Sequence, residues 1–121
     1  KNKKICFLGV TFKANTDDMR DSSSLFMIPS LIKKGAKVNY FDPTGEKAEF
    51  KKLKNVKFSS NINSAIKHSD LIIIHTEWND FKSINFKKEV QNKKFIIFDM
   101  RNIYSSFKMK KLNIKHYGVG C

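Results

Sequence analysis

The sequence has few cysteines, few arginines and no long apolar run, and each shortage excludes a class of protein. Its two cysteines are Cys6, inside an apolar run, and Cys121, the last residue, so a disulfide-stabilised fold is excluded and a reducing, cytoplasmic setting is expected. No Cys-x-x-Cys pair occurs and the three histidines lack ligand spacing, so we expect no metal site. No apolar run approaches the ~20 residues that a membrane span requires, so we expect no membrane partner.

The length of 121 residues allows a single domain, residues 1–121, with a true hydrophobic core. Hydrophobic residues make up 40% of the chain and include eleven phenylalanines, which argues against disorder. Because the chain opens on Lys1 rather than on Met, we expect it to be part of a longer protein.

A net charge of +13 would suit a nucleic-acid binder, but the distribution of the charge does not. Lysine accounts for 22 of the 24 basic residues, the lysines are spread over the whole chain, and no basic patch is interleaved with aromatic residues. We therefore expect no specific nucleic-acid partner, and only weak, salt-sensitive adhesion to polyanions.

The two arginines, Arg20 and Arg101, carry more information than the lysines. A guanidinium offers a planar fork that binds two oxygens of a phosphate or carboxylate, which an ammonium group does not. An arginine in a lysine-rich chain therefore marks either a ligand contact or a structural ion pair, for example with Asp17 or Asp99, and the residues alone leave both interpretations open.

Short apolar runs alternate with helical patterns every 20–30 residues or so, without hairpin turns. This alternation predicts an α/β, three-layer, Rossmann-like fold: a doubly wound, mostly parallel sheet of five to six strands with helices on both faces. Asp21 to Ser24 supply N-cap residues for the first helix, in which Pro29 predicts a kink. The expected strands are 4–9, 38–41, 56–58, 70–75, 94–98 and 114–117; the expected helices are 25–34, 46–54, one through 67, 86–90 and 107–112.

In an open parallel sheet, ligands bind beyond the carboxyl ends of the strands, where the strand order reverses. If the order is 3-2-1-4-5-6, three groups of residues converge there with a lysine, an arginine and an aromatic face. This combination predicts a site for an anionic, ring-bearing ligand. The groups are Thr11, Phe12 and Lys13; Thr76, Glu77 and Trp78; and Asp99, Met100 and Arg101.

The first turn lacks the Gly-x-Gly-x-x-Gly run with which a dinucleotide fold cradles a pyrophosphate. The chain has Gly9-Val-Thr-Phe-Lys-Ala14 instead, so we expect that it does not hold NAD on its own, although Lys13 can bind a phosphate as a point charge. We also identify no catalytic residue, because Cys6 lies in a strand and no Gly-x-Ser-x-Gly elbow occurs.

Four segments taken together resemble the C-terminal domain of the UDP-glucose/GDP-mannose dehydrogenase family. They are residues 12–22, 40–43, 76–78 with Phe81, and 99–102; the Thr-Glu-Trp segment favours the UDP-glucose branch. The resemblance implies a UDP-sugar-binding domain of an enzyme that oxidises UDP-glucose to UDP-glucuronate with two NAD, for polysaccharide biosynthesis. It also implies an N-terminal NAD-binding domain, a central dimerisation domain and a homodimer, with both of those domains absent from this chain.

The same resemblance assigns roles to individual residues. Phe12, Lys13 and Arg101 resemble substrate contacts, Arg20 resembles a residue that reaches the NAD held by the N-terminal domain, and Thr76, Glu77 and Trp78 would line the pocket wall. The catalytic cysteine would lie in another domain, so the chain is expected to be inactive alone. Met100 stands where the family usually has glycine, which would crowd the pocket or change the backbone. Alternatives are a dehydrogenase of UDP-N-acetylmannosamine or GDP-mannose, or a stand-alone nucleotide-binding module.

Overall fold

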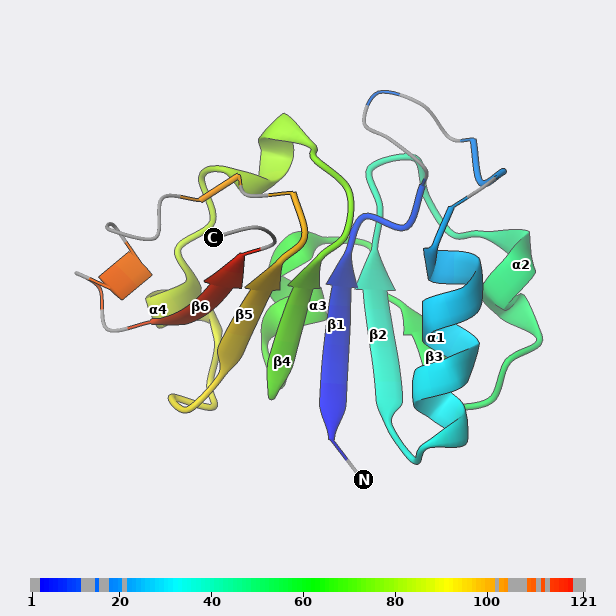
Figure 1. Ribbon diagram of the computed structural model, residues 1–121, viewed down its shortest axis with the longest axis horizontal. Helices are drawn as coiled ribbons and strands as arrows, with labels where there is room; N and C mark the ends of the chain where they lie inside the picture. The colour runs from blue at the N-terminus through cyan, green and yellow to red at the C-terminus, as the bar shows by residue number, and fades with distance from the viewer. Residues whose placement is uncertain are drawn as a thin grey trace.

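A six-stranded parallel sheet forms the centre of the computed structural model, with the strands in the order β3-β2-β1-β4-β5-β6 (Figure 1). The structure describes residues 3–11, 15, 18–20, 22–101, 103–104, 109–110, 112 and 114–118. The strands are β1 (Lys4–Leu8), β2 (Lys37–Phe41), β3 (Val56–Phe58), β4 (Leu71–Ile74), β5 (Ile96–Asp99) and β6 (Lys115–Gly118). The helices are α1 (Ser24–Lys33), α2 (Ala48–Lys51), α3 (Ile62–Ile66), the single 3₁₀ turn η1 (Asn79–Phe81) and α4 (Phe86–Glu89).

The observed order confirms the predicted doubly wound sheet. The chain moves outward from β1 to β3 and then crosses back to β4, on the other side of β1, so the strand order reverses between β1 and β4. In Figure 1 the carboxyl ends of all six strands point to the upper edge of the sheet, so the turns that follow them gather there.

Side chains alternate between two hydrophobic clusters, one on each face of the sheet. In β1, Cys6 and Leu8 belong to the cluster that α3 and α4 cover, whereas Ile5 and Phe7 belong to the cluster under α1 and α2. Burial on both faces explains the continuous apolar run of this strand. Burial also raises the pKa of the Cys6 thiol far above its ordinary value, which makes the thiol a poor nucleophile.

Two local predictions differ from the structure. The helix expected over 46–54 is reduced to α2, because the Lys47 amide donates to Tyr40 Oη (2.8 Å) and Asn55 adopts a left-handed backbone (φ 65°). Ser23 occupies the N-cap position of α1, but its side chain makes no capping bond.

The helix expected over 107–112 lies partly outside the described residues. Within the part of the chain that is described, no helix is long and apolar enough to span a membrane.

Candidate functional site

The turns that follow β1, β4 and β5 meet at the point where the strand order reverses. Gly9 is in contact with the turn after β4, since a Cβ placed on it would lie 2.5 Å from Thr76 Cβ. The backbone of Gly9 has φ +81°, a conformation that side chains disfavour. Glycine at this position therefore permits two strand ends to approach each other, which is a different use from cradling a pyrophosphate.

Hydrogen bonds from distant elements hold the turn after β1. Asp42 at the end of β2 is 1% exposed, and its Oδ2 accepts from the Val10 amide at 2.9 Å. The Val10 carbonyl accepts from the hydroxyls of Ser22 (2.5 Å) and Ser24 (2.6 Å) at the start of α1. The hydroxyls of Ser22 and Ser24 therefore bind the β1 turn. The hydroxyl of the N-cap residue Ser23 binds His75 Nε2 (2.8 Å), which is why the predicted side-chain cap is missing.

The same bonds test whether this turn fits the pyrophosphate of NAD, the cofactor that the resemblance implies. A dinucleotide fold presents backbone N–H groups of this turn and of the following helix start. Here the Gly9 amide donates to Phe41 O (2.8 Å), the Val10 amide donates to Asp42, and the Leu25 amide donates to Ser22 O (3.2 Å). These donors are engaged within the protein, so the described part of the turn does not fit a dinucleotide pyrophosphate.

His75 follows β4 and joins the turn after β1 to helix α1. Thr76 Oγ1 donates its one hydrogen to Thr11 O (2.9 Å), so it accepts from His75 Nδ1 (3.1 Å). The ring proton is thus on Nδ1, and Nε2 accepts from Ser23 Oγ (2.8 Å). Burial, and to a smaller extent the Arg101 charge, lowers the His75 pKa to about 4, although Asp42 opposes the shift. The ring is therefore neutral at pH 7.

Arg101 lies in the turn after β5 and is bound to the turn after β4. Its Nε donates to the His75 backbone carbonyl at 3.0 Å, and its backbone amide donates to Asp99 Oδ1 at 3.2 Å. The residue is exposed, so its guanidinium is accessible at the rim of the three turns. Of the two acids considered as structural partners, Asp99 binds the Arg101 amide, and Asp17 lies outside the described residues.

Asp99 is fully buried and connects three segments at this end of the sheet. Besides the Arg101 amide, its carboxylate accepts from the Tyr104 amide (2.9 Å) and contacts His116 Nε2 in β6 (3.2 Å). The Tyr104 hydroxyl donates to Phe81 O after β4. The turn that carries Arg101 is therefore fixed to its neighbours through one carboxylate.

The three residues proposed for the pocket wall have different surroundings. Thr76 is fully buried in the hydrogen-bond network described above, and Glu77 is exposed. Trp78 is 8% exposed and packs in the hydrophobic cluster with Phe81; among the described residues its buried Nε1 has no hydrogen-bond partner. Of these side chains, Glu77 is the one accessible to a ligand.

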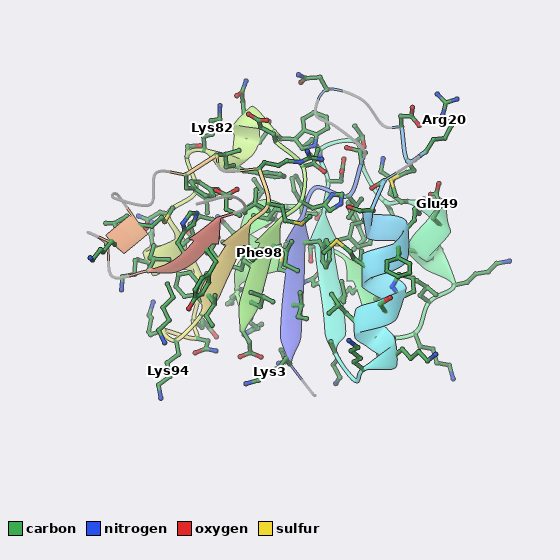
Figure 2. All side chains as sticks on the ribbon, viewed as in Figure 1. Lys3, Arg20, Glu49, Lys82, Lys94 and Phe98 are labelled. Carbon is green, nitrogen blue, oxygen red and sulfur yellow. The ribbon has the colours of Figure 1, made fainter. Side chains whose placement is uncertain are left out.

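Arg20 lies apart from this centre. Its guanidinium binds Asp18 through Nε (3.1 Å) and Nη2 (3.0 Å), and its side chain is 88% exposed. Figure 2 shows Arg20 pointing away from the body of the molecule. Phe12 and Lys13, the two other predicted contacts, lie outside the described residues.

Met100, which stands in the place of a glycine, fits the β5 turn with an ordinary backbone. Its amide donates to Ile74 O (3.1 Å), its φ is not positive, and its side chain packs on the hydrophobic cluster under α1. One effect expected of Met100 was a change of the local backbone, and the structure shows no left-handed conformation at this residue.

In the part of the chain that the structure describes, no three histidine, cysteine or carboxylate side chains group as metal ligands.

Sequence reasoning missed Asp42, His75 and His116 as organisers of the site. Asp42 and His75 directly follow the apolar runs of β2 and β4, and that position was the available signal. His116 had no such signal, because its partner lies 17 residues away on another strand.

Comparison with known proteins shows the family to which the chain belongs. Residues 6–106 match the model of the UDP-glucose/GDP-mannose dehydrogenase family, UDP binding domain. The chain is similar to UDP-glucose 6-dehydrogenase of Rickettsia felis, with 39% identity over 123 aligned residues. That match covers 99% of this chain and 28% of the relative, so the chain spans less than a third of the length of the curated relatives it matches.

Two solved structures that superimpose on this chain share its fold. UDP-D-ManNAc dehydrogenase of Pyrococcus horikoshii superimposes with a TM-score of 0.73 at 27% identity, over 98% of this chain and 26% of that one. NDP-N-acetyl-D-galactosaminuronic acid dehydrogenase of Methanosarcina mazei superimposes with a TM-score of 0.83 at 22% identity, over 98% and 25%, which shows a common fold.

Proposed function

The chain belongs to the UDP-glucose/GDP-mannose dehydrogenase family as a UDP-binding domain, and from this premise we propose that it binds the UDP moiety of a nucleotide sugar. The ligand would lie across the turns after β1, β4 and β5. The enzyme of which it would form part oxidises UDP-glucose to UDP-glucuronate with two NAD. The observation that carries the proposal is the anchoring of Arg101 at this junction by the His75 carbonyl.

The physical argument rests on the geometry of the guanidinium. Because Nε is held on the His75 carbonyl, the plane of the guanidinium is oriented before a ligand arrives. The side chain therefore loses less conformational entropy when the ligand binds. A positioned fork recognises two oxygens of a diphosphate or a sugar carboxylate. Phe12 and Lys13 would complete the contacts, and their roles rest on the family resemblance.

NAD would be held by another part of the longer enzyme, because the β1 turn described here does not fit its pyrophosphate. When bound there, NAD supplies the hydride acceptor for oxidation of the sugar alcohol. Arg20, exposed and remote from Arg101, would face that cofactor from this domain. The longer enzyme would be a cytoplasmic homodimer.

A second candidate differs in the sugar. UDP-D-ManNAc dehydrogenase of Pyrococcus horikoshii is 27% identical over 98% of this chain, and this similarity favours an alternative in which the bound UDP is the same and the sugar differs. Competition between UDP-glucose and UDP-N-acetylmannosamine in the longer enzyme separates these substrates.

Titration of UDP into the chain, followed by NMR, tests the proposed site. We expect weak binding with shifts at Thr76, Glu77 and Arg101, and about a tenfold loss for Arg101→Lys, since an ammonium group replaces neither the fork nor the bond to His75. Lys94→Arg at the opposite end of the sheet is the matched control. If UDP binds the Arg101→Lys variant as well as the original chain, Arg101 is not part of the site.

A further inference from the structure

We propose that the chain has a second binding pocket, at the opposite edge of the sheet, for a small molecule that carries two or more phosphate groups. A cavity of about 310 Å³ lies at the amino ends of β1, β2 and β3, against α3. Small-molecule sites span roughly 300–1,000 Å³, so the size of this cavity suits a compact metabolite. The proposal is independent of the UDP site, which lies at the other ends of the strands (Figure 1).

The strand register places three lysines on one face of this cavity. Lys4 and Lys37 are direct partners in the pairing of β1 with β2, and alternation puts both on the α3 side of the sheet. Lys57 of β3 is the direct partner of Asn39 on the same face.

Helix α3 and the residues after it supply the facing wall. Four of the lining residues are Ser64, Ala65, His68 and Ser69. His68 adds an imidazole ring, which can donate a hydrogen bond to an anion.

The three ammonium groups have no partner of opposite charge among the described residues. Among the residues that the structure describes, no carboxylate lines the cavity, and none of the three lysines forms a salt bridge. The carboxylate of Asp70, which follows the lining residue Ser69, accepts from the Lys4 amide (2.9 Å) and from Asn92 Nδ2 (2.7 Å). Like charges on directly opposed positions repel, so a bound anion would remove an existing repulsion.

The residues that line the cavity also include two neutral side-chain donors, the Asn39 amide and the Ser69 hydroxyl. Asn39 Oδ1 accepts from Ser59 Oγ at 2.8 Å, which leaves its Nδ2 as a donor with a long 3.4 Å bond to Ala65 O. Ser69 is 3% exposed, and its Oγ makes a similar 3.4 Å bond to the same carbonyl. The Asn39 amide can shift to a phosphate oxygen at little cost, because a 3.4 Å bond is weak. The Ser69 hydroxyl also has a hydrogen bond with the buried Cys6 thiol.

Titration of inorganic pyrophosphate into the chain, followed by NMR, locates the site. We expect shifts at Lys4, Lys37, Lys57, His68 and the Asn39 side-chain amide. These shifts should persist in Arg101→Gln, so that failure of the UDP site and failure of this pocket are told apart. Equal shifts at lysines over the whole surface, or binding of heparin but not of pyrophosphate, would overturn the proposal.

Substitutions of the lysines test whether their charges contribute to pyrophosphate binding. Lys37→Gln and Lys57→Gln should each weaken pyrophosphate binding about two- to fivefold, and the double variant about tenfold. The matched control is Lys94→Gln, an exposed lysine that Figure 2 shows at the same lower edge of the sheet, outside the pocket. Lys37→Gln should also raise Tm at low salt, and pyrophosphate should raise the Tm of the original chain more than that of the double variant. An equal loss of affinity in Lys94→Gln would refute the pocket.

Discussion

The Nε of Arg101 donates a hydrogen bond to the backbone carbonyl of His75, and the side chain of the same histidine binds Ser23 and Thr76. One residue after β4 therefore links the turn that carries Arg101, the start of α1 and, through the Thr76 bond to Thr11, the turn after β1. The candidate UDP site thus depends on residues that would not themselves touch the ligand.

Replacement of Gly9 by alanine should strongly destabilise the fold. The new Cβ would lie 2.5 Å from Thr76 Cβ on a backbone with φ +81°, so we expect a loss of about 2–4 kcal/mol in the free energy of unfolding. Urea unfolding measures it. Gly45→Ala is the control, because φ is +95° there but nothing lies within 4 Å, and it should cost about 1 kcal/mol. Equal losses would show that the contact with Thr76 is unimportant.

Stability should fall as the pH drops from about 6.5 to about 4, partly through His75. The folded pKa is lowered from 6.5 to about 4, so the unfolded chain binds the proton more readily. This contribution is fully present above pH 6.5 and is lost as the pH falls toward 4, by about 3 kcal/mol at most. His75→Gln should be less stable at pH 7 but should lose less stability over this interval. The same pH slope in both proteins would contradict the assignment.

Asp99→Asn should loosen the turn that carries Arg101. The carboxylate is 0% exposed and accepts from two backbone amides, and an amide side chain also brings donors that this site does not require. We expect a loss of about 2–3 kcal/mol in stability and weaker UDP binding. Thermal unfolding and the UDP titration measure the two effects. The exposed Asp80 provides a matched Asp→Asn control, for which both quantities should be unchanged.

The chain by itself should not reduce NAD in the presence of UDP-glucose. The described donors of the β1 turn are engaged within the protein, and burial raises the pKa of Cys6 far above its ordinary value. NADH absorbance provides the assay, with the Rickettsia felis relative as the positive control. Measurable turnover by this chain would place a cofactor site and a nucleophile within it.

The sequence alone determined the class of the sheet, whereas the order of its strands was an assumption that the structure confirmed. Apolar runs such as 70–75 are long and unbroken because both faces of a central parallel strand are buried, and their spacing requires helical crossovers. The same pattern located the turns where Arg101 and Thr76 now meet, because parallel strands end at one edge. The family motifs then indicated the ligand class.

Only the tertiary structure decided which side chains hold that site together. Asp42 reaches the Val10 amide across 32 residues, Ser23 reaches His75 across 52, and Lys4 pairs with Lys37 through strand register. A local pattern reports whether a position is buried, since burial follows hydrophobicity. A local pattern does not predict which donor, distant in sequence, will lie opposite a buried acceptor, because this pairing depends on the packing of whole helices and strands.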